Sequence, residues 1–161
     1  MTVAEYNQCI DQYADGVYRF ILKNIKDEEQ ARDIVQDTFA KMWEKAKDVS
    51  FSKSKSYLFT AAYNTMIDYI RKQKRQEDID GYTHLSQTGS AGYSDLKEIL
   101  DEAVERLPDI QRTVLLLRDY EGYSYQEIGE ITGLNESQVK VYIYRARVFM
   151  KNYLVSMEHV I

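Results

Sequence analysis

The chain has 161 residues, enough for one ordinary domain or two very small ones. Hydrophobic residues make up 44% and charged residues 29%, a balance typical of soluble globular proteins and not of disordered or membrane proteins. One proline and 7 glycines favour helices over a turn-rich β-sandwich. The single cysteine, Cys9, excludes an internal disulfide framework and a multi-cysteine zinc site, and it fits the reducing cytosol.

The sequence predicts neither a secretory signal nor a membrane span. The first residues carry no basic stretch ahead of an apolar core. The longest aliphatic run, residues 114–117, is far shorter than the ~20 residues that a membrane-spanning helix needs. We therefore expect a soluble cytoplasmic protein without membrane insertion.

The net charge of −5 conceals two basic regions. Residues 49–76 carry a net charge of +5 and residues 137–161 a net charge of +3, whereas residues 1–48 carry −3 and residues 77–136 carry −10. A phosphate backbone responds to the local potential within a Debye length of ~8 Å rather than to the total charge. Each basic region is therefore a candidate nucleic-acid surface, and a solvated helix face is the alternative.

Apolar residues at the start of the chain recur at helical spacing and predict two helices. The first covers residues 6–21. The second opens at Asp27, which together with Gln30 has the form of a capping box. The apolar stripe of the second helix ends with Met42, Trp43 and Ala46.

A serine-rich segment at 50–56 then interrupts the pattern and favours a loop, because serine side chains compete for backbone hydrogen bonds. A third helix is expected over 58–70. It ends in a basic cluster at 71–75, which also complements the helix dipole.

Residues 77–95 differ from the rest of the chain. They contain three glycines among serines and threonines and show no sustained apolar period. This composition is typical of a flexible linker, and an ordered loop packed through Ile79, Tyr82 and Leu85 is the alternative. We expect an N-terminal domain at 1–76 and a C-terminal domain at 96–161.

The C-terminal domain also reads as helical. Ser94 or Asp95 caps a helix over 96–107, and Pro108 separates it from a second helix that ends at 120–122. The predicted fold class is all-α, with two small helical domains joined by a flexible linker.

Residues 124–138 carry the most specific pattern in the chain. Ser124 and Glu127 form one capping box, and Asn135 and Gln138 form a second. Gly133 falls where the turn between the two helices needs a left-handed backbone. The pattern predicts a helix-turn-helix, whose second helix normally enters the major groove of DNA.

The second helix of this motif separates into two faces. Its buried stripe is expected to hold Val139, Ile143 and Ala146. Polar and basic side chains near the start of such a helix suit contacts with base edges and phosphates. The exposed face carries Ser137, Lys140, Val141, Tyr144 and Arg145, and Arg147 and Lys151 flank it.

Three stretches together resemble the extracytoplasmic-function sigma factors, the small two-domain class of bacterial RNA polymerase specificity subunit. Residues 33–39 resemble the helix that binds the polymerase clamp in this family. Residues 57–71, with Asn64, Asp68 and Arg71, resemble its promoter-melting helix. Residues from Leu107 onward resemble its C-terminal DNA-reading domain.

The resemblance implies roles for residues in the N-terminal domain. Asp33, Gln36 and Asp37 share one helix face and match positions that pair with the β′ clamp of polymerase. Asn64 matches a position near a flipped base of the minus-ten element, and the 50–56 loop matches the loop that captures this base. Phe51, Tyr57 and Tyr63 are nearby candidates for stacking. Backbone phosphates would be held by Arg71, Lys72, Lys74 and Arg75.

The resemblance also implies contacts and partners for the C-terminal domain. The minus-thirty-five contacts would come from Ser137, Lys140, Val141, Tyr144, Arg145 and Arg147. The implied partners are core RNA polymerase, through its β′ clamp and β flap, and promoter DNA. Relatives are often held inactive by an anti-sigma protein, which is a further candidate partner.

Two other functions fit parts of the sequence. A stand-alone helix-turn-helix regulator explains residues 124–151 equally well, but it gives no purpose to the acidic face at 33–37 or to the basic cluster at 71–75. A helical enzyme is disfavoured, because His84 and His159 lack partners at metal-ligand spacing and no phosphate-cradling glycine loop is present. We expect no catalytic residue, no metal and no cofactor.

Overall fold

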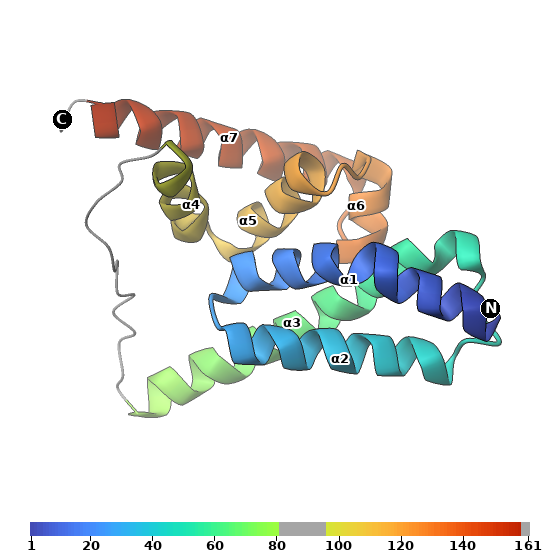
Figure 1. The fold of residues 1–161 in the computed structure, drawn as a ribbon. Helices are drawn as coiled ribbons and strands as arrows, with labels where there is room; N and C mark the ends of the chain where they lie inside the picture. Colours follow the sequence, from blue (N-terminus) through green and yellow to red (C-terminus); the bar gives the residue numbers. More distant parts are fainter. Residues whose placement is uncertain (81–95, 159–161) are drawn as a thin grey trace.

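The computed structural model describes residues 1–80 and 96–158, and these residues form helices with no strand among them (Figure 1). The first unit contains α1 (Val3–Ile25), α2 (Glu28–Glu44) and α3 (Ser54–Asp80), with a short 3-10 turn, η1 (Phe51–Lys53). The second contains α4 (Leu96–Arg106), α5 (Asp109–Leu115), α6 (Tyr125–Thr132) and α7 (Glu136–Glu158), with a π-helical turn, η2 (Leu116–Tyr120). The predicted all-α fold is confirmed. Across the part of the chain described, no helix is both long and apolar enough to cross a membrane.

The N-terminal helices begin and end at local signals in the sequence. The Thr2 hydroxyl accepts the Glu5 N–H, and the Glu5 carboxylate accepts the Thr2 N–H, so a full capping box opens α1. Lys26 adopts a left-handed conformation with φ of 57° and ends α1. The Asp27 carboxylate then accepts the Gln30 N–H at 3.1 Å, so α2 begins where the sequence predicts.

Three sequence expectations differ from the structure. The predicted 50–56 loop is shorter, because the buried Ser54 hydroxyl donates to the Phe51 carbonyl at 2.7 Å and α3 already begins at Ser54. Helix α3 also continues to Asp80, past the expected start of the linker at 77. Trp43 is 50% exposed, whereas its neighbour Met42 is fully buried. The linker composition at 81–95, and the cap by Ser94 or Asp95, lie outside the described residues.

The predicted helix-turn-helix is present in α6 and α7. The Ser124 hydroxyl accepts the Glu127 N–H at 3.1 Å, and the Glu127 carboxylate accepts the Ser124 N–H at 3.0 Å. Asn135 and Gln138 form the same reciprocal pair at the start of α7. Gly133 has a φ of 81° and ends α6 in the left-handed region, as the sequence predicts.

The two units pack against each other around one continuous buried core (Figure 1). The Phe59 ring of α3 lies 5.4 Å from the Tyr123 ring, measured between centroids, and 5.7 Å from that of Phe20 in α1. The Arg19 guanidinium donates to the Glu121 carboxylate at 2.8 Å. The residues 121–123 that precede the helix-turn-helix are therefore docked on the N-terminal unit.

Helix α6 lies very close to the turn of the helix-turn-helix at Gly129. A Cβ atom there would lie 2.7 Å from the Leu134 carbonyl oxygen, a backbone atom that cannot move aside without shifting the turn. We expect Gly129→Ala to lower the free energy of unfolding by about 1–3 kcal/mol, measured by chemical denaturation.

The matched control is Glu130→Ala, because Glu130 is exposed on the same helix and a substitution there is expected to change the free energy of unfolding by less than about 0.5 kcal/mol. Equal stability of the two variants would contradict the close packing described for this turn.

Candidate DNA and polymerase interfaces

The predicted clamp-binding residues lie on the outer face of α2. Asp33, Gln36 and Asp37 are all exposed, whereas Ile34 and Thr38 turn into the core. Asp37 also forms an ion pair with Lys41, 3.0 Å away and one turn later. Asp33 adds to this face a carboxylate that forms no ion pair within the described residues.

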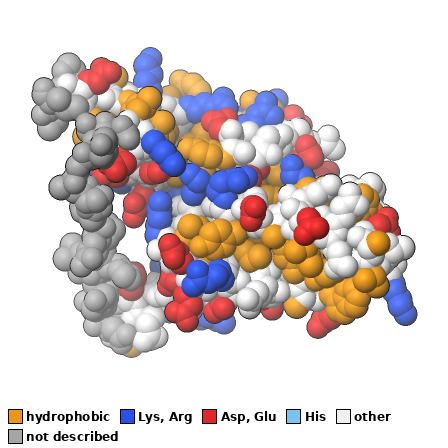
Figure 2. All heavy atoms as spheres, in the orientation of Figure 1, with side chains coloured by type: hydrophobic (Ala, Val, Ile, Leu, Met, Phe, Trp, Pro, Cys, Tyr) orange, Lys and Arg blue, Asp and Glu red, His pale blue; other side chains and the backbone are white. Residues whose placement is uncertain are grey.

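The sequence pattern missed Trp43 as a residue of this surface. Its ring packs edge-on against Tyr6 of α1, with centroids 4.9 Å apart, yet half of the side chain remains exposed. Trp43 follows Gln36 by seven residues, two helical turns, and therefore lies on the same side of α2. Figure 2 shows apolar side chains gathered over the seam between α1 and α2 and at the C-terminal end of α2. The spacing of seven residues from Gln36 is the sequence signal that could have placed Trp43 on this side of the helix.

Helix α3 brings the predicted minus-ten residues onto its exposed surface. Asn64 lies two turns before Arg71, so the two side chains share one side of the helix. Together with Asp68, the basic residues line a shallow open hollow. All five predicted residues are exposed: Asn64, Arg71, Lys72, Lys74 and Arg75.

One cation of this cluster, Lys74, already forms an ion pair with the C-terminal unit. The Lys74 ammonium donates to the Asp109 carboxylate of α5 at 2.7 Å, so an acidic group of the C-terminal unit reaches into the basic surface of the N-terminal unit. Burial raises the pKa of the Asp109 carboxyl, but hydrogen bonds from Lys74 and Arg112 outweigh it and hold that pKa below its ordinary value. Asp109 is therefore ionised at neutral pH.

The aromatic stacking candidates near the 50–56 segment are only partly accessible. Phe51, Tyr57 and Tyr63 pack against the core and are half-buried, and burial raises the pKa of the Tyr63 hydroxyl. Lys55 lies over the Tyr123 ring, 4.6 Å from its centroid. The C-terminal unit therefore covers part of the start of α3.

The predicted minus-thirty-five residues are exposed along α7. Tyr144 is 70% exposed and Val141 45% exposed, unusual values for apolar side chains on a packed helix. The outward set comprises Ser137, Lys140, Val141, Tyr144, Arg145 and Arg147. Lys140 lies 3.5 Å from the Glu136 carboxylate, an exposed contact within the helix.

Arg147 differs from the other five because it forms an ion pair with a residue outside its own helix. Its guanidinium donates to the Asp119 carboxylate at 2.6 Å, and this hydrogen bond raises the pKa of Arg147 above its ordinary value. Arg147 lies two turns after Lys140, at the rim of a groove between α4, η2 and α7.

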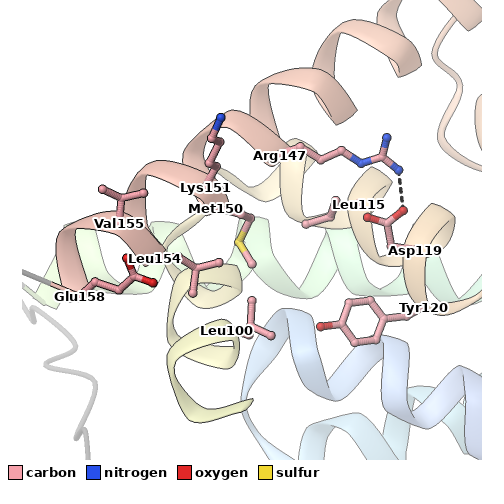
Figure 3. Close-up of a pocket in the computed structure, with 10 residues that line it drawn as sticks. All are labelled: Leu100, Leu115, Asp119, Tyr120, Arg147, Met150, Lys151, Leu154, Val155 and Glu158. Atoms are coloured by element: carbon pink, nitrogen blue, oxygen red, sulfur yellow. Dashed lines mark hydrogen bonds and ion pairs between the residues drawn. The ribbon is translucent and has the colours of Figure 1, made fainter. Parts of the chain in front are cut away.

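This groove was not predicted from the sequence. Its volume is about 590 Å³. Figure 3 shows Leu100, Met150 and Leu154 pointing into it from two helices, with the Arg147–Asp119 pair at one end. The rim also carries Lys151 and Glu158, and Tyr120 closes the side nearest α1, where Lys23 lies 4.5 Å from the centroid of the tyrosine ring. An apolar floor with charged rims suits an amphipathic helix.

The described residues hold no cluster of three or more His, Cys, Asp or Glu side chains that could bind a metal ion. The chemistry that these surfaces offer is recognition: a mixed acidic and apolar face on α2, cations on α3, a polar and basic face on α7, and an apolar groove beside it.

Comparison with known proteins identifies both units. Residues 9–76 match the family described as Sigma-70 region 2, and residues 97–150 match Sigma-70, region 4. The chain is 33% identical over 156 residues to the ECF RNA polymerase sigma factor SigM of Bacillus subtilis, covering 94% of each chain. It is 34% identical over 146 residues to the RNA polymerase sigma factor SigV of the same organism, covering 89% of this chain and 87% of SigV.

The fold also matches a solved structure. The sigma factor RpoE from Bartonella quintana, crystallised with the anti-sigma factor NepR, superposes with a TM-score of 0.78 at 28% sequence identity. The match covers 94% of this chain and 98% of that one.

Proposed function

The chain belongs to the extracytoplasmic-function sigma factors of RNA polymerase, and we propose that two of its surfaces bind core polymerase and that two others read promoter DNA. The chain binds core polymerase and directs the enzyme to promoters. The observation that carries the proposed division of labour is that the proposed polar and charged contact residues of α2, α3 and α7 are exposed outside one shared core.

The outer face of α2 is the proposed contact with the β′ clamp. Asp33 and Asp37 supply negative charge that basic residues of a partner can pair with, and the exposed Trp43 supplies apolar area next to them. Aromatic residues are enriched among those that dominate binding energy in protein interfaces, so we assign Trp43 to the same contact.

The basic face of α3 is the proposed contact with the minus-ten element. Arg71, Lys72 and Arg75 are exposed and suit the phosphates of a melted strand, with an affinity that falls as salt rises. Asn64 lies two helical turns before Arg71. Its side-chain amide offers both a donor and an acceptor to the edge of an unpaired base.

The face of α7 from Ser137 to Arg145 is the proposed contact with the minus-thirty-five element. Lys140 and Arg145 suit guanine or phosphate, and Val141 suits the methyl group of thymine. Helix α7 is the second helix of the helix-turn-helix, the one that enters the major groove in proteins of this type.

The groove lined by Leu100, Met150 and Leu154 is the proposed site for a helix of the polymerase β flap. The relative RpoE was solved with an anti-sigma factor, and a protein of that class is the second protein partner we expect for this chain.

The first test concerns the clamp surface. We expect the double variant Asp33→Lys/Asp37→Lys to bind core polymerase about tenfold more weakly or worse, because it replaces attraction by repulsion at the contact. Binding is measured by gel filtration and by fluorescence titration of labelled chain with core polymerase.

Its matched control is Asp11→Lys/Asp15→Lys, an exposed pair on α1 with the same spacing and the same change in charge. Equal affinity of the two double variants would remove α2 from the interface. An unmodified chain that fails to bind core polymerase would favour a stand-alone helix-turn-helix regulator.

The second test concerns promoter reading. We expect Lys140→Ala and Arg145→Ala each to lower transcription from a cognate promoter by about five- to a hundredfold, since a good base contact is worth ~1–3 kcal/mol. Transcription is measured in vitro with core polymerase and a promoter library. Lys97→Ala, which removes an exposed cation from α4, is expected to transcribe normally. Normal transcription by both α7 variants would mean that the recognition face lies elsewhere.

The third test concerns the groove. We expect Val155→Asp to weaken binding of an isolated β-flap fragment by about tenfold, because it places a charge at an apolar contact. Val155 is 44% exposed, so the substitution leaves the core intact. The control Asn152→Asp adds the same charge in the same turn but outside the groove. Equal weakening by both variants would contradict a contact in the groove.

A further inference from the structure

Helix α7 carries a line of exposed apolar side chains on the side opposite its buried stripe. Val141, Tyr144 and Val148 follow one another at spacings of three and four residues, so they lie on one line along the helix. Val148 is 40% exposed and lies outside the residues assigned above to the minus-thirty-five contact. We call these three residues the apolar ridge of α7.

The fold itself gives the apolar ridge no partner. Within the described residues, the Tyr144 side chain forms no hydrogen bond and no ring contact, although it is the most exposed of the three. Large apolar side chains that lie together on a surface indicate a contact with another molecule. The ridge is therefore a candidate contact in its own right.

Two cations lie on one side of the ridge, toward α6 and η2. The Lys140 ammonium lies 5.6 Å from the centroid of the Tyr125 ring of α6. The Arg147 guanidinium donates to the Asp119 carboxylate of η2, and Figure 3 shows it turned toward that group. Both side chains are thus drawn away from the centre of the exposed face.

A third cation lies on the other side of the ridge. The Arg145 guanidinium lies 6.0 Å from the centroid of the Tyr142 ring, which is itself half-buried. Positive charge therefore flanks the ridge on both sides. Because these cations are drawn to neighbours at the sides, the apolar ridge is the part of α7 that faces directly outward.

This arrangement matches the major groove of DNA. A helix in the groove has a phosphate backbone on each side and base edges in front of it. Flanking cations suit the two backbones, which leaves the ridge opposite the base edges. The apolar group that bases present in the major groove is the C5 methyl of thymine, so an apolar line selects thymine there.

We propose that the apolar ridge reads thymine methyl groups in the minus-thirty-five element, with Val148 and the Tyr144 ring as specificity-determining residues beside Val141. The proposal rests on the proposed function of α7. Val141 and Val148 are seven residues apart, ~10 Å along the helix axis. Base pairs follow one another every ~3.4 Å, so the two valines reach methyl groups about three base pairs apart.

Replacing thymine by deoxyuridine tests this readout, because it removes the methyl group and keeps every hydrogen-bonding group of the base. A cognate promoter is first selected from a library with the wild-type chain and core polymerase. Each thymine of its minus-thirty-five element is then replaced in turn, and binding of the holoenzyme to the labelled promoter is titrated at one fixed salt concentration. We expect about fourfold weaker binding for each methyl group that the ridge contacts.

Variants of the ridge connect each methyl group to a side chain. Val141→Ser and Val148→Ser are each expected to abolish the deoxyuridine effect at one position and to keep it at the other. Tyr144→Phe retains the ring and is expected to keep every effect. The matched control is Val3→Ser, the same change at an exposed valine of α1, which is expected to keep every effect as well. Thermal melting by circular dichroism confirms that each variant is folded.

Equal binding to thymine and deoxyuridine at every position would overturn the proposal, as would a deoxyuridine effect that both serine variants of α7 retain in full. A dimer of the free chain that Val148→Ser dissociates, with no deoxyuridine effect, would assign the ridge to a contact between two copies. Failure of the wild-type chain to transcribe from any promoter of the library would instead overturn the proposed function, so the outcomes are distinct.

Discussion

Burial of one stripe of each helix in a shared core is the constraint on which the rest of this structure depends. Phe20 of α1, Phe59 of α3 and Ile143 of α7 are all almost completely buried in that core. A helix that buries one stripe leaves its opposite face free of packing requirements. The outer faces of α2, α3 and α7 therefore carry acidic, basic and mixed side chains without cost to the fold, and these are the faces to which we assign recognition.

The sequence predicts the parts of this fold that depend on neighbouring residues. Two capping boxes and the left-handed Gly133 define α6 and α7, because each is a contact within a few residues along the chain. Exposure of Lys140 and Tyr144 also follows from helical spacing. The functional roles of these side chains come from the family resemblance and remain predictions.

The remaining features depend on contacts between distant residues. Trp43 follows the buried Met42 in the sequence, and only the position of α1 decides that half of its ring stays exposed. Arg112 donates a hydrogen bond to Asn24, 88 residues away in the sequence, and polar side chains leave no periodic pattern that would pair them. The apolar groove likewise needs α4 and η2 to be placed beside α7. These are consequences of packing, and helical periodicity does not encode them.

Tyr120 belongs to two surfaces at once, since it lines the groove and its ring is also covered by Lys23 of α1. A helix that enters the groove and uses this ring face has to displace the lysine. Thermodynamic reciprocity then applies: whatever factor the loss of the Lys23 contact adds to the affinity of the groove, an occupant of the groove adds to the equilibrium for breaking that contact. Binding in the groove and the position of Lys23 on α1 are in that sense coupled through one tyrosine ring.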